Sequence, residues 1–146
     1  MQMQAELRHA AFELGSIPWQ ERRGPRSAKD GRIRILGVDD DVLLADQITE
    51  AVRRMGLEPV GPVGTLGAAV ALAETQELHG ALLDVRLQRE LRVYPVAEVL
   101  QRRRIPFCFM TAYCEQRVAA MTAEAVLYKP FSLSALRAAI NALLDA

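Results

Sequence analysis

From Arg32 onward the sequence alternates short apolar runs, rich in β-branched residues, with longer segments of helical periodicity. This alternation is typical of a parallel β-sheet that is covered by helices on both faces. The runs predicted to form strands span residues 32–38, 58–61, 80–84, 106–110 and 125–128. The predicted fold class is therefore α/β, with a helix after each strand.

Caps and turn residues indicate where the connecting helices begin and end. Helices are predicted over 42–55, over about 66–76 with Thr65 as cap, from about Tyr94 with Pro95 in the first turn, and after Ser132. The first opens after Asp40 and Asp41 and closes at Gly56, which fits acidic residues at a helix start and glycine at its end. Only 111–124 remain for the fourth helix, which is therefore expected to be short or irregular.

The 146 residues, of which 51% are apolar, suffice for one core without disulfides or a structural metal. Residues 1–31 differ in character, because they end in the charged stretch ERRGPRSAKDG, which indicates a linker. Before the linker, an apolar stripe at helical spacing predicts a short amphipathic helix: Met3, Leu7, Ala10, Ala11 and Leu14. This helix would lie on its own domain or contact a second copy or a partner. The predicted division is an N-terminal extension, 1–31, and a domain, 32–146.

Charge and cysteine content exclude several classes of protein. The 18 basic and 18 acidic residues cancel, so no net field draws the chain to nucleic acid or anionic lipid. The run Arg102, Arg103 and Arg104 is assigned to the end of the third helix, where cations complement the helix dipole. Cys108 and Cys114 suit buried apolar positions in a reducing compartment better than a disulfide framework. With no apolar membrane span and no signal peptide, we expect a cytoplasmic protein that binds neither nucleic acid nor membrane.

Polar residues of complementary chemistry stand at the ends of four predicted strands. Asp39 and Asp40 follow ILGV, Asp84 follows ALL, Thr111 follows FCFM and Lys129 follows VLY. In an open parallel sheet, functional groups gather at the carboxyl ends of strands, so these side chains are expected in one crevice. Each alone has an ordinary explanation, such as a helix cap or a surface charge. Their conjunction indicates a site.

The chemistry of these groups indicates an acyl phosphate. Three carboxylates in one crevice raise one another's pKa, and a bridging divalent cation removes that repulsion. Hard oxygen ligands that leave room for water suit Mg²⁺. A hydroxyl at Thr111 and an ammonium at Lys129 add a hydrogen-bond donor and a positive charge for a tetrahedral anion carried by one carboxylate.

The motifs ILGVDDD, ALLDVRL, FMTAY and YKPF resemble those of the receiver domains of bacterial two-component response regulators, and the resemblance covers residues 32–146. It implies a flavodoxin-like, doubly wound five-stranded parallel sheet, (βα)5, which here follows an N-terminal helical extension. Stretches such as VYPVAEVLQRRRIPF are similar to an alphaproteobacterial subgroup of stand-alone and kinase-fused receivers.

The resemblance also implies roles for individual residues. They are Asp84 as phosphoacceptor, Asp39 and Asp40 as the acidic pair that binds Mg²⁺, and Thr111 and Lys129 as the hydroxyl and the lysine of the site. The backbone carbonyl of Arg86 would complete the protein ligands of Mg²⁺. The peptide bond between Lys129 and Pro130 would be cis.

The implied function is that of a phosphoacceptor in two-component signal transduction or a phosphorelay. The implied partners are a histidine kinase or histidine phosphotransfer protein, and a downstream protein that binds the surface of the fourth helix and fifth strand; a homodimer stays open. Such a receiver catalyses only its own phosphorylation and dephosphorylation, so it is not a metabolic enzyme. Two alternatives stay open: a receiver excised from a hybrid histidine kinase and, in another class, an aspartyl-phosphate phosphohydrolase.

Two features depart from the family's pattern. Most receivers carry Tyr or Phe three residues before the lysine, whereas this chain has Val126, so a ring-flip switch is not expected there. The segment after Asp84, VRLQRELRVYPV, lacks the usual Pro and Gly, so the third helix is expected to start differently. Tyr113 has open roles: it covers the phosphoryl group, replaces the missing switch ring, or packs on the fourth helix.

Overall fold

The computed structural model of the 146-residue chain describes residues 31–88, 91–112, 118, 123 and 125–145. A five-stranded sheet forms its centre, and every neighbouring pair of strands in it is parallel. In spatial order the strands are β2 (Glu58–Val63), β1 (Arg34–Val38), β3 (Gly80–Asp84), β6 (Phe107–Thr111) and β7 (Ala125–Tyr128). The chain builds from β1 to β2 on one side and then to β3, β6 and β7 on the other. The direction therefore reverses between β1 and β3, where open α/β sheets place their ligands.

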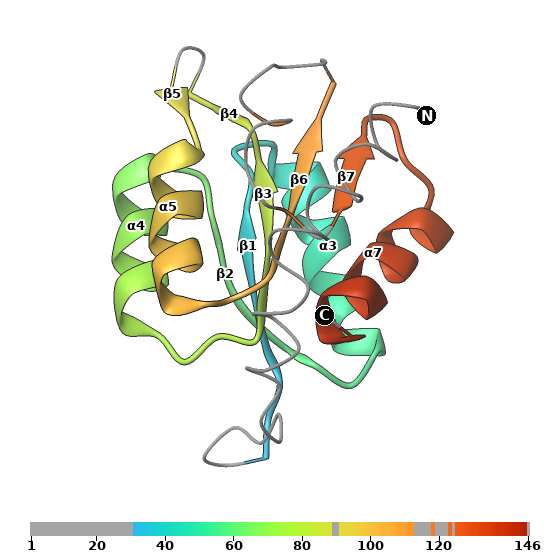
Figure 1. The fold of residues 1–146 in the computed structure, drawn as a ribbon. Helices are drawn as coiled ribbons and strands as arrows, with labels where there is room; N and C mark the ends of the chain where they lie inside the picture. The colour runs from blue at the N-terminus through green and yellow to red at the C-terminus, as the bar shows by residue number, and fades with distance from the viewer. Residues whose placement is uncertain (1–30, 89–90, 113–117, 119–122, 124, 146) are drawn as a thin grey trace.

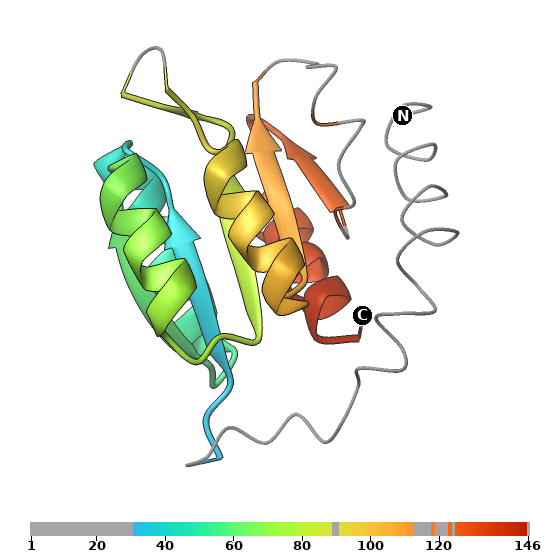
Figure 2. The ribbon, with the colours of Figure 1, turned by 60° about the vertical axis from the view of Figure 1, so that its left-hand side comes forward.

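Helices cover both faces of the sheet, as Figures 1 and 2 show. The helices α4 (Leu66–Thr75) and α5 (Tyr94–Arg103) lie side by side on one face, and α3 (Val42–Arg54) and α7 (Leu133–Asp145) lie on the other. Each face has its own apolar core, which includes Phe107 and Phe109 on the α4 and α5 side and Ile140 and Leu143 on the α3 and α7 side. The predicted doubly wound α/β sheet is confirmed.

The helix starts follow the predicted caps. Asp41 accepts hydrogen bonds from the backbone N–H groups of Leu43 and Leu44, and Thr65 accepts one from Ala68. These side chains satisfy N–H groups that have no partner within the helix. Pro95 lies in the first turn of α5, as predicted.

The strands β3 and β7 have the predicted bounds, whereas β2 runs on to Val63 through an irregularity. Gly61 has a φ of +86°, and a Cβ there would lie 2.9 Å from the backbone nitrogen of Val63 and 3.1 Å from the carbonyl oxygen of Gly37. Only glycine fits this position without strain. The irregularity brings the Val63 carbonyl to the N–H of Asp39, 3.0 Å away, and so attaches the end of β2 to the end of β1.

A β-hairpin separates β3 from α5, and the sequence had indicated only that this helix would start differently. Its strands are β4 (Arg86–Leu87) and β5 (Leu91–Arg92), which pair antiparallel. The Leu87 side chain is fully buried in the core of the α4 and α5 face, and the N–H of Val93 donates to the carbonyl of Val85 over 2.9 Å. The hairpin therefore stands anchored at the carboxyl end of the sheet, at the top of Figure 1.

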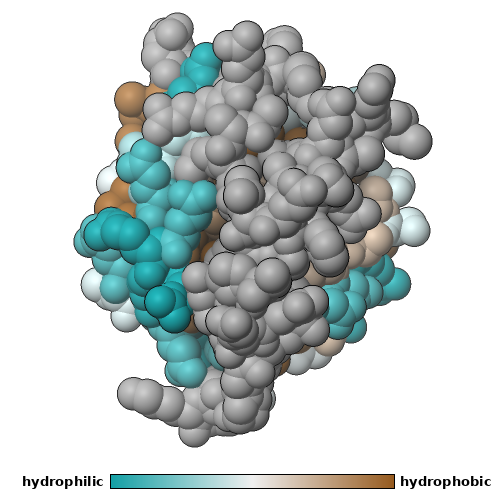
Figure 3. Space-filling model, viewed as in Figure 1, coloured by the Kyte–Doolittle hydropathy of each residue, from teal (hydrophilic) through white to brown (hydrophobic). Residues whose placement is uncertain are grey.

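The helix α5 is amphipathic, which accounts for the helical periodicity of its sequence. Hydrophilic side chains gather over this helix in the space-filling view (Figure 3). Its residues Glu98 and Arg102 are exposed to solvent. Val96 and Leu100 face the core on the other side. In the part of the chain that the structure describes, no helix is long and apolar enough to cross a membrane.

Several predictions fall outside the described residues. They concern the amphipathic helix of the extension, Tyr113, Cys114 and most of the fourth helix, of which the structure describes only Val118 and Ala123, both buried. The division at residue 31 stays a prediction for the same reason. Cys108 is buried, as predicted.

Candidate functional site

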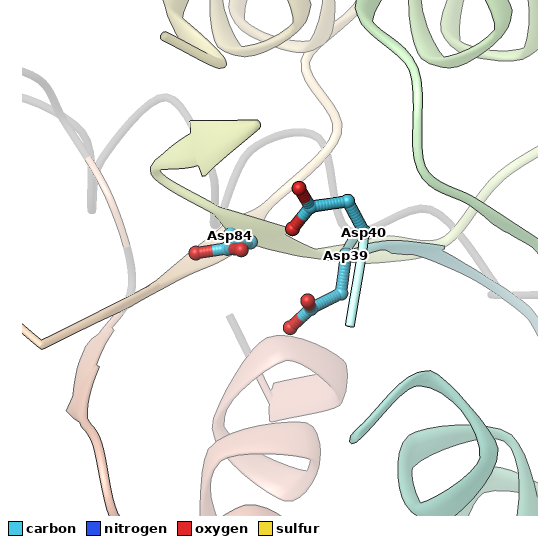
Figure 4. A group of neighbouring side chains, drawn as sticks. All are labelled: Asp39, Asp40 and Asp84. Atoms are coloured by element: carbon cyan, nitrogen blue, oxygen red, sulfur yellow. The ribbon is translucent and has the colours of Figure 1, made fainter. Parts of the chain in front are cut away.

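Three carboxyl groups meet at the carboxyl ends of β1 and β3. Side-chain oxygens of Asp39, Asp40 and Asp84 all lie within 4.8 Å of one another. Figure 4 shows that the carboxyl groups of Asp39 and Asp40 are directed to the side where Asp84 lies. Asp39 and Asp84 are 3% and 6% exposed, whereas Asp40 is exposed to solvent. The structure therefore brings together the acidic residues that the sequence predicted would meet.

The backbone holds the acidic pair in place. The N–H of Asp41 donates to Oδ1 of Asp39 over 2.9 Å, which fixes the Asp39 carboxylate against the start of α3. A Cβ at Gly64 would lie 3.1 Å from the Cα of Asp40, so the loop after β2 packs closely on this turn. The small residue at position 64 thus allows the end of β2 to support the acidic pair.

Lys129 supplies the positive charge of the site. Its Nζ lies 3.3 Å from Oδ1 of Asp84 and 3.4 Å from Oδ2 of Asp39. The Lys129 N–H donates to the carbonyl of Thr111 over 2.8 Å, so the lysine is attached to the end of β6. The peptide bond between Lys129 and Pro130 is cis, as the resemblance implied.

Thr111 is the last residue of β6 and is 3% exposed. The parallel register pairs Asp84 with Met110, so Thr111 stands one residue beyond the level of Asp84 on the neighbouring strand. Thr111 therefore stands at the same edge of the sheet as Asp84 and Lys129. Among the described residues, no buried side-chain oxygen or nitrogen lacks a hydrogen-bond partner.

Burial and charge act on Asp84 together. Burial raises the pKa of Asp84, the neighbouring Asp39 carboxylate raises it further, and Lys129 opposes both, which leaves a pKa of about 7. A carboxylate whose ionised form is disfavoured in this way gains from a nearby cation. The donor set consists of hard carboxylate oxygens, and one of its members is open to solvent, which fits Mg²⁺ with retained waters.

Other residues from the sequence analysis take different places. Arg86 begins β4 with an exposed side chain, and a role for its carbonyl as a metal ligand stays a prediction. Val126 is buried in the core of the α4 and α5 face. The position three residues before the lysine therefore holds an aliphatic core side chain and no aromatic ring.

Sequence reasoning missed one contact to the site. The backbone N–H of Gln88 donates to Oδ2 of Asp40 over 3.0 Å, across 48 positions of sequence. No residue type announces such a contact, because it depends on the hairpin that carries Gln88. The only signal was the absence of the usual Pro and Gly after Asp84.

The comparisons with known proteins agree with this site. No family model matches the chain. SdrG from Sphingomonas melonis Fr1, a solved structure, is 34% identical, with a TM-score of 0.67, over 77% of this chain and 97% of that one. The transcriptional regulatory protein PdtaR from Mycobacterium tuberculosis is 32% identical over 124 residues, which are 81% of this chain; the match spans 60% of that curated relative's length.

Two further structures place the fold among signalling proteins. The response regulator PhyR from Brucella abortus is 28% identical over 78% of this chain and 48% of that one, with a TM-score of 0.67. The receiver domain of the sensor histidine kinase PA1611 from Pseudomonas aeruginosa shares the fold at 24% identity and a TM-score of 0.67, over 79% of this chain and 99% of that one, and has a magnesium ion in its active-site cleft. On these similarities and on its acidic, lysine-paired crevice, the chain belongs to the receiver domain family of two-component response regulators.

Proposed function

We propose that Asp84 accepts a phosphoryl group from a phosphohistidine, and that the chain acts in signalling through this modification. One observation carries the assignment: the Asp84 carboxylate lies between an acidic pair that suits Mg²⁺ and the Lys129 ammonium, at the switch point of the sheet. Asp39 and Asp40 would hold Mg²⁺ together with Asp84. The Arg86 carbonyl is the proposed further protein ligand.

The proposed transfer breaks one bond and forms one. A carboxylate oxygen of Asp84 forms a bond to phosphorus while the bond between phosphorus and the donor imidazole breaks, and the imidazole nitrogen keeps that electron pair. When bound, Mg²⁺ supplies positive charge that offsets the phosphoryl oxygens beside the carboxylates. Lys129 pairs with one phosphoryl oxygen, and the Thr111 hydroxyl donates a hydrogen bond to another. Asp84 must be ionised to attack, which the nearby cations favour.

The proposed partners follow from this chemistry. The donor is a histidine kinase or a histidine phosphotransfer protein, and the readout is a downstream protein that binds at the fourth helix and β7. The chain then catalyses only its own phosphorylation and dephosphorylation, and has no metabolic substrate. We also propose a cytoplasmic location, because the buried position of Cys108 in the core suits a reducing compartment better than a disulfide framework.

The phosphohydrolase alternative is not favoured. Enzymes of the haloacid-dehalogenase type carry a DxD motif at the nucleophile and a large cap domain. In this chain Asp84 ends β3 in the sequence DVR, and only the small hairpin β4 and β5 follows it before α5. Whether the domain acts alone or within a hybrid kinase does not change the chemistry of Asp84.

Mass spectrometry after incubation with acetyl phosphate and Mg²⁺ tests the assignment. We expect one phosphoryl group per chain, no addition when EDTA replaces Mg²⁺, and no addition to Asp84→Asn. Asp41→Asn is the matched control. Asp41 is the acidic residue next to Asp40, but it caps α3 and stands outside the carboxylate cluster. Labelling that persists in Asp84→Asn would reject the assignment.

A further inference from the structure

The hairpin β4 and β5 touches the acidic cluster through one backbone group. The N–H of Gln88, in the turn between the two strands, donates to Oδ2 of Asp40 over 3.0 Å. At its base the hairpin is fixed by buried Leu87 and by the bond from the Val93 N–H to the Val85 carbonyl. The base is thus held by the core, and the turn is held by a metal-site carboxylate.

The backbone of Gln88 is strained, which indicates that the surrounding contacts hold this residue in its conformation. Its φ is +46°, in the left-handed region that a side chain with a Cβ adopts at a cost. Such positions persist where surrounding contacts determine the conformation, and they cluster at functional sites. The hydrogen bond to Asp40 is a contact of this kind, because the Asp40 carboxylate accepts a charge-assisted hydrogen bond from the N–H of the strained residue.

The contact orients the one carboxylate of the three that is exposed to solvent. Asp39 and Asp84 are buried and held by Asp41 and Lys129, whereas the Asp40 side chain is exposed to solvent. An exposed side chain loses rotamer freedom when it binds a metal. The Gln88 N–H engages Oδ2, which restricts the orientation of the carboxylate that would hold the cation.

We propose that Gln88 is a positioning residue for the metal site, and that the hairpin turn and Mg²⁺ binding stabilise each other through Asp40. Hydrogen-bond partners behind metal ligands contribute to affinity by fixing those ligands. Because coupling between two binding equilibria is reciprocal, occupancy of the cluster also strengthens the hold on the Gln88 backbone. The hairpin then becomes a surface element that responds to the state of the crevice.

This inference rests on the proposed Mg²⁺ site, but its tests do not depend on phosphorylation. The first test measures the hydrogen-exchange rate of the Gln88 amide by NMR in the full chain. Asp40→Ala should raise the rate roughly tenfold, the equivalent of one lost hydrogen bond. Asp41→Ala is the matched control and should leave the rate unchanged, since Asp41 bonds only the start of α3 among the described contacts.

Asp40→Asn separates hydrogen bonding from charge. Its side-chain oxygen still accepts from Gln88, so protection should be retained although the charge is gone. Saturating Mg²⁺ should slow Gln88 exchange further in the unmodified chain and have no effect in Asp40→Ala. Exchange that is the same in wild type and Asp40→Ala, or that Mg²⁺ accelerates, overturns the proposal.

The second test measures Mg²⁺ affinity by calorimetry in two variants of Gln88. Gln88→Pro removes the N–H and, because proline fixes φ at about −65°, also excludes the observed φ of +46°, so the contact to Asp40 is lost and Mg²⁺ binding should weaken about tenfold, the size found for partners behind metal ligands. Gln88→Gly keeps the N–H and suits the positive φ, so its affinity should equal or exceed that of wild type. Equal affinities in both variants overturn the positioning role, whereas a wild-type chain that binds no Mg²⁺ at all would instead reject the proposed metal site.

Discussion

At the scale of single residues, the site is a balance of charges around Asp84. The carboxylate is buried beside Asp39, and only Lys129 opposes the rise of its pKa to about 7. The proton, the Lys129 ammonium and a bound metal ion therefore compete to neutralise the Asp84 carboxylate, the proposed phosphoacceptor. Each competitor can be removed separately.

Without Mg²⁺, stability should fall as pH rises from 3.8 to about 7, the unfolded and folded pKa values of Asp84. In this window the folded chain keeps a proton that the unfolded chain has lost, so raising the pH favours unfolding. Above pH 7 this contribution is flat. Urea unfolding in EDTA across this range measures the slope.

Asp84→Asn serves as the reference for that slope, since its amide does not titrate. The difference in free energy of unfolding between wild type and this variant should change with pH in EDTA. In saturating Mg²⁺, which keeps Asp84 ionised, the difference should no longer depend on pH over the same window. A difference that is independent of pH in EDTA would contradict the raised pKa.

Lys129→Met should bind Mg²⁺ more tightly than wild type, by about tenfold, because it removes a cation that lies 3.3 Å from Asp84. The same variant should lose the coupling between phosphorylation and surface change, since the ammonium pairs with the added phosphoryl group. Calorimetry gives the first quantity, and chemical-shift differences between phosphorylated and free protein give the second. Weaker Mg²⁺ binding, or unaltered shift changes in β7, would count against this role.

At the scale of elements, positions between strands and helices carry strict requirements. The irregularity in β2 attaches the end of this strand to Asp39, and Arg103 attaches α5 to α4. The arginine run had been assigned to the dipole of its own helix. The structure places Arg102 and Arg103 in the last turn of α5, as assigned, and shows in addition that Arg103 donates to the carbonyls of Ala73 and Gln76, at the end of the neighbouring helix.

Gly61→Ala should destabilise the fold by about 3 kcal/mol, because its positive φ and its close backbone neighbours leave no room for a Cβ. Gly67→Ala is the matched control. It lies in α4 with no heavy atom within 4 Å of the added Cβ, and should stabilise by about 0.5 kcal/mol. Denaturant titrations of both variants check the signs, and equal effects would contradict the geometry at Gly61.

Arg103→Ala should cost roughly 1–2 kcal/mol, because two carbonyls at the end of α4 lose a charged donor. Its neighbour Arg102 is exposed and in the last turn of the same helix, so Arg102→Ala should stay within about 0.5 kcal/mol of wild type. Thermal unfolding of the two variants measures the contrast. If both lose the same stability, the dipole of α5 would account for the arginines better than the contact to α4.

Sequence reasoning succeeded where a local pattern determines an element, and failed where distant segments do. Apolar runs fix β3, and the Asp41 and Thr65 caps fix the starts of α3 and α4. The site followed because parallel strands end on one edge. The hairpin could not be predicted, since its strands are two residues each and depend on buried Leu87 and on the bond between Gln88 and Asp40.

At the scale of the whole molecule, the site joins the two halves of the sheet. Asp39 directly follows β1, on one side of the switch point, and Lys129 follows β7 at the far edge. The contact between their side chains spans 90 positions of sequence. A ligand that bridges these groups therefore binds only the complete fold.

Mg²⁺ should consequently stabilise the whole domain against unfolding. At a concentration one hundred times its dissociation constant, a ligand of the folded state adds about 2.7 kcal/mol. The melting temperature should rise with Mg²⁺ in wild type and stay constant in the double variant Asp39→Asn, Asp84→Asn, which removes the two buried carboxylates. A double variant that responds as wild type does would place the metal elsewhere.

The long span between Asp39 and Lys129 also sets when the protein becomes able to signal during its synthesis. A ribosome makes Asp39 and Asp84 early, but the lysine follows the last strand of the sheet. Because contacts of high sequence separation form only after the intervening chain is in place, a partly made chain carries Asp84 without the Lys129 ammonium beside it. A kinase that needs the full crevice would then leave nascent and truncated chains unmodified. The proposed phosphorylation would therefore be restricted to chains whose fold is complete.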